Sequence, residues 1–123
     1  MPELPEVQTV VNYLAPEVQG KFINSIDSPN NYLKVFGNGN LSFVKNAIQG
    51  KKIVRLGRRG KYIIIHLNKG HLILHLRMTG KLLLQGLQKK FDKHLSFRID
   101  FNDNSNLYFY DTRKFGRIYF SKT

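Results

Sequence analysis

Residues 53–85, IVRLGRRGKYIIIHLNKGHLILHLRMTGKLLLQ, contain the pattern that specifies the fold. Short apolar runs rich in isoleucine and leucine alternate there with breaks that contain glycine. Breaks of three or four residues with glycine are typical of antiparallel hairpins. We therefore expect four consecutive strands, separated by GRRG, NKG and RMTG: IVRL (53–56), KYIIIHL (61–67), HLILHL (71–76) and KLLLQ (81–85).

Further strands are expected on both sides of this stretch. After the polar segment 88–93, which we interpret as a loop, HLSFRIDF (94–101) and LYFYD (107–111) are joined by NDNSN, and GRIYF (116–120) follows. Before it, KFINSID (21–27) alternates like a strand, and a short strand is expected around 32–36. This pattern predicts about eight strands.

Two helices are expected near the N-terminus. In the first, apolar residues recur with helical spacing, and Pro5 and Glu6 suit its first turn, with Pro16 and Gly20 at its end. The second begins at Asn40 as N-cap and ends before Gly50. The predicted class is α+β, mainly β: an antiparallel β-sandwich or flattened barrel, flanked by an N-terminal helix and a second short helix.

Composition limits the class of protein. The 123 residues and 41% apolar content fit a single domain with one core. Lys plus Arg outnumber Asp plus Glu by 20 to 8, a net charge of +12, which favours a polyanionic partner, nucleic acid ahead of a membrane surface. Without cysteine, disulfides and a cysteine-based zinc site are excluded in this chain. His71 and His75 fall in a predicted strand, where a structural role is expected.

No apolar run in the sequence is long enough to span a membrane, and the start MPELPEVQ lacks the pattern of a signal peptide. We therefore expect a cytoplasmic protein, associated with the nucleoid if bacterial. The same reasoning predicts no membrane partner.

The first seven residues, MPELPEV, suggest covalent chemistry. Removal of Met1 would leave Pro2 with a free secondary amine, and an α-amino group titrates near pH 8, so much of it is unprotonated at neutral pH. Such an amine can attack a sugar C1′ and form an iminium, with Glu3 and Glu6 close enough to move protons. The alternative is that PELPE serves only to start a helix.

Four motifs occur together in one order: MPELPEVQTV at the start, RRGKYIIIHL at 58–67, HLRMTGKL at 75–82 and DTRKFGRI at 111–118. In this combination the sequence resembles the N-terminal domain of the formamidopyrimidine-DNA glycosylase and endonuclease-eight family over essentially its whole length. The resemblance implies a single catalytic domain, residues 1–123, without the helix–two-turn–helix and zinc-finger regions of the family.

The resemblance implies a base-excision-repair enzyme that removes 8-oxoguanine and formamidopyrimidines and then cleaves the abasic strand by β,δ-elimination. Pro2 matches the Schiff-base nucleophile, Glu3 the acid that opens the sugar, Glu6 a further active-site carboxylate and Lys61 a catalytic lysine near the phosphates. The implied partner is double-stranded DNA with oxidised bases or abasic sites, bound by a monomer. No cofactor is implied in this chain, because zinc belongs to the absent region.

The resemblance also implies DNA-binding residues. Met78, Arg113 and Phe115 match side chains that fill the gap left by an extruded nucleotide, although core packing is the alternative for Met78 and Phe115. His94 matches the second histidine of the family's KHxH motif, with Asp92 at the position of the first. Other basic residues cluster in predicted turns and hairpin edges, where a minority are expected to meet phosphates: Arg58, Arg59, Arg77, Lys81, Lys89, Lys90, Lys93, Lys114 and Arg117.

Several positions depart from the family pattern, which bears on efficiency and lesion preference more than on reaction type. They are Gln8, Arg77, Thr112 and Lys114, where the family usually has Glu, Gly, Pro and Arg. Because the other half of the family's DNA-binding surface is missing, we expect weak DNA binding and little glycosylase turnover from this chain. The rival hypothesis is a DNA-binding module with the same fold and no catalysis. A small ribosomal-type protein is a third possibility, which leaves the start motif unexplained.

Overall fold

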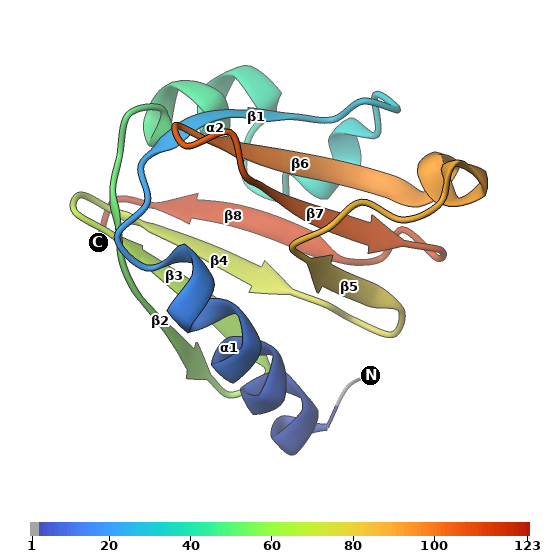
Figure 1. Ribbon diagram of the computed structural model, residues 1–123, viewed down its shortest axis with the longest axis horizontal. Helices are drawn as coiled ribbons and strands as arrows, with labels where there is room; N and C mark the ends of the chain where they lie inside the picture. The colour runs from blue at the N-terminus through green and yellow to red at the C-terminus, as the bar shows by residue number, and fades with distance from the viewer. Residues whose placement is uncertain (1–2) are drawn as a thin grey trace.

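The computed structural model describes residues 3–123, which form two packed four-stranded antiparallel sheets (Figure 1). One sheet has the strand order β1-β6-β7-β5 and the other β2-β3-β4-β8. The predicted eight-stranded sandwich with an N-terminal and a second short helix is confirmed. The elements are α1 Leu4–Val18, β1 Ile23–Asp27, η1 Leu33–Val35, α2 Leu41–Ile48, β2 Ile53–Arg59, β3 Tyr62–Leu67, β4 His71–His75, β5 Gly80–Leu83, η2 Lys89–His94, β6 Leu95–Phe101, β7 Asn106–Asp111 and β8 Arg117–Ser121.

The register of β3 separates a buried face from an outer face. Ile63 and Ile65 are fully buried between the sheets, whereas Tyr62, Ile64 and His66 point to the outer face of the second sheet. Because side chains alternate along a strand, a shift of one residue would exchange these two sets. Burial of the isoleucines therefore fixes which groups the outer face presents.

Helix α1 covers one open side of the sandwich, where it packs on β2 and β3 (Figure 1). Its buried residues recur on one face: Val7, Val11, Leu14 and Val18. The end was predicted at Pro16 and Gly20, and the helix ends between them at Val18, where burial of Val18 stabilises the last turn although Pro16 donates no hydrogen bond. In α2, the predicted cap is confirmed: the Oδ1 atom of Asn40 accepts a 2.8 Å hydrogen bond from the Phe43 amide.

Two local predictions were wrong. The segment around 32–36, expected to be a strand, contains one 3-10 turn, Leu33–Val35, and an isolated bridge from Phe36 to Ile118. The Ser28 Oγ accepts the Tyr32 amide at 2.9 Å, which curls the chain and directs Val35 and Phe36 into the core. The polar loop expected at 88–93 instead contains the 3-10 helix η2. Among residues 3–123, no helix has the length and apolarity required to cross a membrane.

Because the two faces of β3 differ in burial, replacement of isoleucine by alanine should lower the free energy of unfolding by different amounts on the two faces. Ile65→Ala should lower the free energy of unfolding by about 2–5 kcal/mol, because it leaves a cavity in a closed core. Ile64→Ala, the neighbouring control on the outer face, should cost less than about 1 kcal/mol because its side chain is only partly buried. Urea denaturation of both variants measures the difference, and equal costs would contradict the register described above.

Candidate nucleic-acid interface

Three connections lie toward the same region as the start of α1: the β2–β3 turn, the β4–β5 loop (residues 76–79) and the β7–β8 loop (residues 112–116) (Figure 1). We call the latter two the wedge loops. Each of the three connections carries one of the sequence motifs. Tertiary structure thus brings together segments that are up to about a hundred residues apart in the chain.

The buried carboxylate of Asp111, 1% exposed, joins the two wedge loops. Its Oδ1 atom accepts hydrogen bonds from the Thr79 hydroxyl and, at 3.3 Å, from the Arg113 amide. Its Oδ2 atom accepts the Gly116 amide at 2.8 Å, and the Arg113 amide also lies 3.2 Å from Thr79 Oγ1. Asp111 and Thr79 were not predicted as site residues. The sequence signal was their position within two of the quoted motifs, Thr79 in HLRMTGKL and Asp111 at the start of DTRKFGRI.

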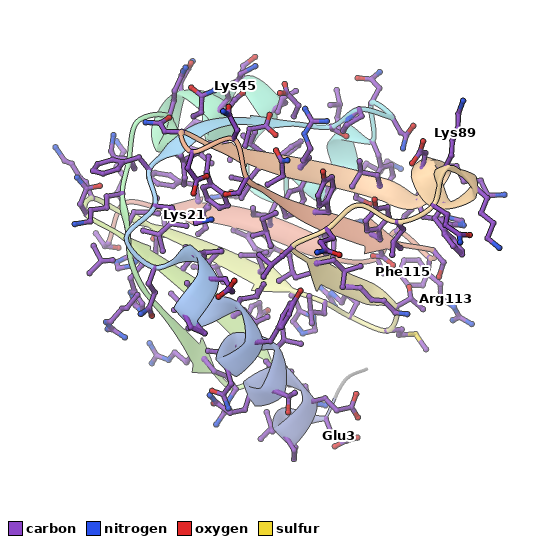
Figure 2. The ribbon with its side chains drawn as sticks, in the orientation of Figure 1. Glu3, Lys21, Lys45, Lys89, Arg113 and Phe115 are labelled. Carbon is purple, nitrogen blue, oxygen red and sulfur yellow. The ribbon has the colours of Figure 1, made fainter. Side chains whose placement is uncertain are left out.

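The three side chains matched to gap filling lie on these loops. Met78 and Phe115 are 52% and 51% exposed, so the alternative that they pack in the core is wrong. The Nη1 atom of Arg113 donates to the Met78 sulfur over 3.6 Å. Met78 and Phe115, with Arg77 and Arg117, line a shallow hollow of about 370 Å³. Figure 2 shows Arg113 and Phe115 projecting from this end of the sandwich.

Local backbone geometry shapes both loops. Arg77 and Lys114 have φ angles of 56° and 61°, in the left-handed region that non-glycine residues seldom occupy. Each is held by hydrogen bonds: the Arg77 amide donates to His75 Nδ1 at 3.0 Å, and the Lys114 carbonyl accepts from the Tyr32 hydroxyl at 2.7 Å. These hydrogen bonds hold the backbone of both wedge loops in a conformation that leaves the side chains of Met78 and Phe115 exposed.

The β2–β3 turn carries Lys61 next to α1. Gly60 takes a φ of 60° in this two-residue turn, directly before Lys61. Arg58 supports the turn, because its Nη1 donates to the Gly60 carbonyl at 3.0 Å and its Nε donates to Gln8 Oε1 of α1 at 3.1 Å. The turn and the first half of the helix are thus directly connected, and Arg59 is exposed beside them.

The acidic candidates lie at the beginning of α1. Glu3 is the N-cap residue, its carbonyl accepts the Val7 amide at 3.0 Å, and its side chain makes no capping bond (Figure 2). Glu6 occupies the first turn, and both carboxylates are exposed. Pro2, the predicted nucleophile, lies outside the described residues. The carboxylates of Glu3 and Glu6 are therefore accessible to solvent, and Lys61 lies on the β2–β3 turn beside the same helix.

His75 lies between the β2–β3 turn and the β4–β5 loop and was predicted to be structural. It is 5% exposed, and its ring packs edge-on against Tyr62, with centroids 4.8 Å apart. Burial lowers its pKa below the usual 6.5, and the positive charges of Arg77 and Lys61 lower this pKa further. Because Nδ1 accepts the Arg77 amide, the ring is neutral and orders the start of the loop.

His94 closes η2 and is half-buried. The helix is attached by Asn30, whose Nδ2 donates to the carbonyls of Asp92 and Leu95 at 2.6 and 3.0 Å. No hydrogen bond found in residues 3–123 joins His94 to the other candidates. Over the same range, no cluster of three or more His, Cys, Asp or Glu side chains is arranged to hold a metal ion.

Comparison with known proteins agrees with this arrangement. Residues 1–118 match the family described as formamidopyrimidine-DNA glycosylase N-terminal domain. The formamidopyrimidine-DNA glycosylases of Pelotomaculum thermopropionicum and Carboxydothermus hydrogenoformans are 40% and 43% identical over 124 and 122 residues, covering 100% and 98% of this chain. The chain spans only 44% and 45% of those relatives.

Two solved structures are similar in fold. A structure of MutM in complex with DNA containing carbocyclic 8-oxo-G superposes with a TM-score of 0.88 and 36% identity, covering 99% of this chain and 45% of that chain. The complex between Lactococcus lactis Fpg and DNA with an abasic site gives a TM-score of 0.88 and 35% identity, with the same coverage. The sandwich with its flanking helices therefore matches slightly less than half of each of these two chains.

Replacing the carboxylate that joins the wedge loops should destabilise the protein. Asp111→Asn keeps the shape of the side chain but turns an amide group toward hydrogen-bond donors, which should lower the free energy of unfolding by about 1–3 kcal/mol. Asp92→Asn, an exposed control, should change it by less than about 0.5 kcal/mol. Urea denaturation tests both, and indistinguishable midpoints would refute the joining role of Asp111.

Stability should fall on mild acidification. Burial and, secondarily, the charges of Arg55 and His71 lower the pKa of His66, as burial chiefly does for His75. As the pH falls below about 6.5, these histidines become protonated in the unfolded chain before they do in the folded one. The free energy of unfolding therefore decreases until the pH falls below the lowered pKa values of the folded state. We expect a lower melting temperature at about pH 5.5 than at about pH 7.5. The double variant His66→Gln/His75→Gln should reduce the difference, and a melting temperature that rises on acidification would contradict it.

Proposed function

Because the chain belongs to the formamidopyrimidine-DNA glycosylase family, as its N-terminal domain, we propose that it forms a Schiff base with damaged DNA through Pro2. The proposed substrates are 8-oxoguanine, formamidopyrimidines and abasic sites in double-stranded DNA. The proposed activity is base removal followed by β,δ-elimination. The relatives that support this proposal are glycosylases about twice as long, so the activity of the isolated domain is part of the proposal.

The observation that carries the proposal is the gathering of the β2–β3 turn, the start of α1 and the wedge loops toward one region. The groups proposed to react with the sugar and the exposed apolar side chains of the wedge loops must act at the same site on the DNA, so they must lie close to one another. The hydrogen bond between Arg58 and Gln8 supports this, because it holds the turn with Lys61 against the helix that begins at Glu3. The net charge of +12 suits a polyanionic partner.

The proposed chemistry begins at the nitrogen of Pro2. Its lone pair attacks C1′, the bond from C1′ to the base breaks, and the base leaves with the proton of that nitrogen, so that an aminal joins Pro2 to C1′; it becomes the iminium when the bond from C1′ to the ring oxygen breaks. Glu3 protonates the sugar ring oxygen as the ring opens. Loss of a C2′ proton then expels the 3′ phosphate, and a second elimination expels the 5′ phosphate. Glu6 and Lys61 are proposed to assist the proton transfers.

The wedge loops are proposed to hold the duplex open. Met78 and Phe115 expose apolar surface that can replace lost stacking, and Arg113 can hydrogen-bond the unpaired partner base. Arg58, Arg59 and His94 are proposed to contact phosphates. We propose that the domain acts as a monomer in the cytoplasm, and that this region of the family uses no metal.

Borohydride trapping tests the nucleophile. Processed chain incubated with abasic-site duplex and borohydride should form a covalent adduct, because reduction converts the iminium to a stable amine. The adduct should disappear in a variant that retains an uncleaved residue ahead of Pro2, since the nitrogen is then an amide, and should fall strongly in Pro2→Gly. Gel electrophoresis and intact mass measure the product.

Lys61→Arg is the control that separates the two possible amines, and it should still form the adduct. An adduct that survives blocking of Pro2 but is lost in Lys61→Arg would assign the nucleophile to the lysine. Absence of any adduct with processed, folded chain would favour the rival hypothesis of a DNA-binding module without catalysis.

A further inference from the structure

The outer face of the sheet β2-β3-β4-β8 is hollowed over about 890 Å³. The hollow is separate from the wedge loops, although one end of it begins at Arg58 and Arg59 beside the β2–β3 turn. Its floor is apolar, formed by Gly57, Ile64 and Ile73, and the rings of Tyr62 and Tyr119 also line it. Pockets that accept small organic molecules measure roughly 300–1,000 Å³ and are likewise mostly apolar with a few polar groups.

Apart from the hydroxyls of the two tyrosines and of Thr123, the last residue of the sequence, the polar side chains that line the hollow are all basic or imidazole groups: Arg55, Arg58, Arg59, His66 and His71. Among the side chains described as lining it, none is a carboxylate. The three salt bridges found within residues 3–123 involve other side chains, those of Lys21, Lys45 and Arg98. The positive charge of Arg55 and Arg59 is therefore not neutralised by a carboxylate partner within the described part of the chain.

The end of the hollow far from the β2–β3 turn contains a histidine pair. Nδ1 of His66 lies 2.9 Å from Nδ1 of His71, and the two rings are perpendicular. Burial, the charge of Arg55 and the neighbouring His71 together lower the pKa of His66. Arg55, which is paired with His66 across β2 and β3, places a positive charge at this end of the hollow, where a bound anion would be stabilised.

We propose that this hollow binds single-stranded DNA, with phosphates at Arg55 and Arg59 and unstacked bases against Tyr62, Tyr119 and the isoleucine floor. Proteins that bind single strands combine a basic groove with aromatic rings, and each stacked base contributes about 1–3 kcal/mol. A duplex hides its base faces in the stack and offers chiefly phosphates along its outside, so an apolar floor suits a single strand better. The proposal does not depend on the nucleophilic role of Pro2.

The hollow extends along β3, and this sets the direction in which a bound strand would run, which we call the binding track. Tyr62 and His66 are four residues apart on β3, a span of about 13 Å at about 3.3 Å per residue. The track therefore runs along the strand from the β2–β3 turn, where Arg59 and Lys61 lie, to the histidine pair. A strand that leaves the proposed catalytic region past this turn would meet Arg59 and Tyr62 first and Arg55 last.

Fluorescence anisotropy with a short labelled oligothymidylate at low salt tests the proposal on the whole chain. Arg55→Gln should weaken binding by about 5-fold, and Ile64→Glu, which places a carboxylate on the floor, by more than about 10-fold. The matched control Lys89→Gln removes one positive charge from η2, away from the hollow (Figure 2), and should change binding by less than about 2-fold. Melting temperatures of all variants establish that they are folded.

The outcomes separate this site from the proposed catalytic one. Arg55→Gln should leave the yield of borohydride-trapped adduct on abasic duplex unchanged. Unaltered oligothymidylate binding in folded Arg55→Gln and Ile64→Glu would overturn the proposal. Equal weakening by Arg55→Gln and Lys89→Gln would also overturn it, because binding would then follow net charge alone.

Discussion

The buried carboxylate of Asp111 is the interaction on which the candidate site depends. A charged carboxylate withdrawn from water requires hydrogen-bond donors, and here it takes them from Thr79 in one wedge loop and from Arg113 and Gly116 in the other. The two loops therefore form one unit. The β4–β5 loop also requires glycine at Gly80, where it enters β5, since a Cβ atom there would come within 2.6 Å of the Leu76 carbonyl oxygen and 2.7 Å of the Phe109 ring.

The second constraint is the register of the β2-β3-β4-β8 sheet. Ile63 and Ile65 must face the core, so the intervening Ile64 and the flanking Tyr62 and His66 must face outward. One pattern of hydrophobic burial thus produces both the stability of the sandwich and the chemistry of its outer face. The same strand begins directly after Lys61 in the β2–β3 turn, so the core also positions the candidate catalytic lysine.

Local sequence predicted most of the elements and most of the exposed candidates. Alternation and turn residues identified the strands, and Asn40 was correctly predicted as a helix cap. The two wrong predictions have a common cause, because the 32–36 segment and η2 are held by contacts with residues distant in sequence. His75 was interpreted correctly as structural, but Asp111 and Thr79 were not recognised, since Asp111 looks like an ordinary polar residue at the end of a strand and Thr79 like an ordinary polar residue of a turn.

The sequence alone determined the strand and helix content, the excess of positive charge and the family, because these follow from local pattern, composition and motifs that are each contiguous in the chain. Only the tertiary structure decided which motifs meet. Thr79 and Asp111 are 32 residues apart and Gln8 and Arg58 are 50 apart, and no local pattern states that they hydrogen-bond. Such contacts arise because antiparallel pairing and burial of one shared core fix the ends of the strands, and the ends of the strands fix where the connecting loops lie.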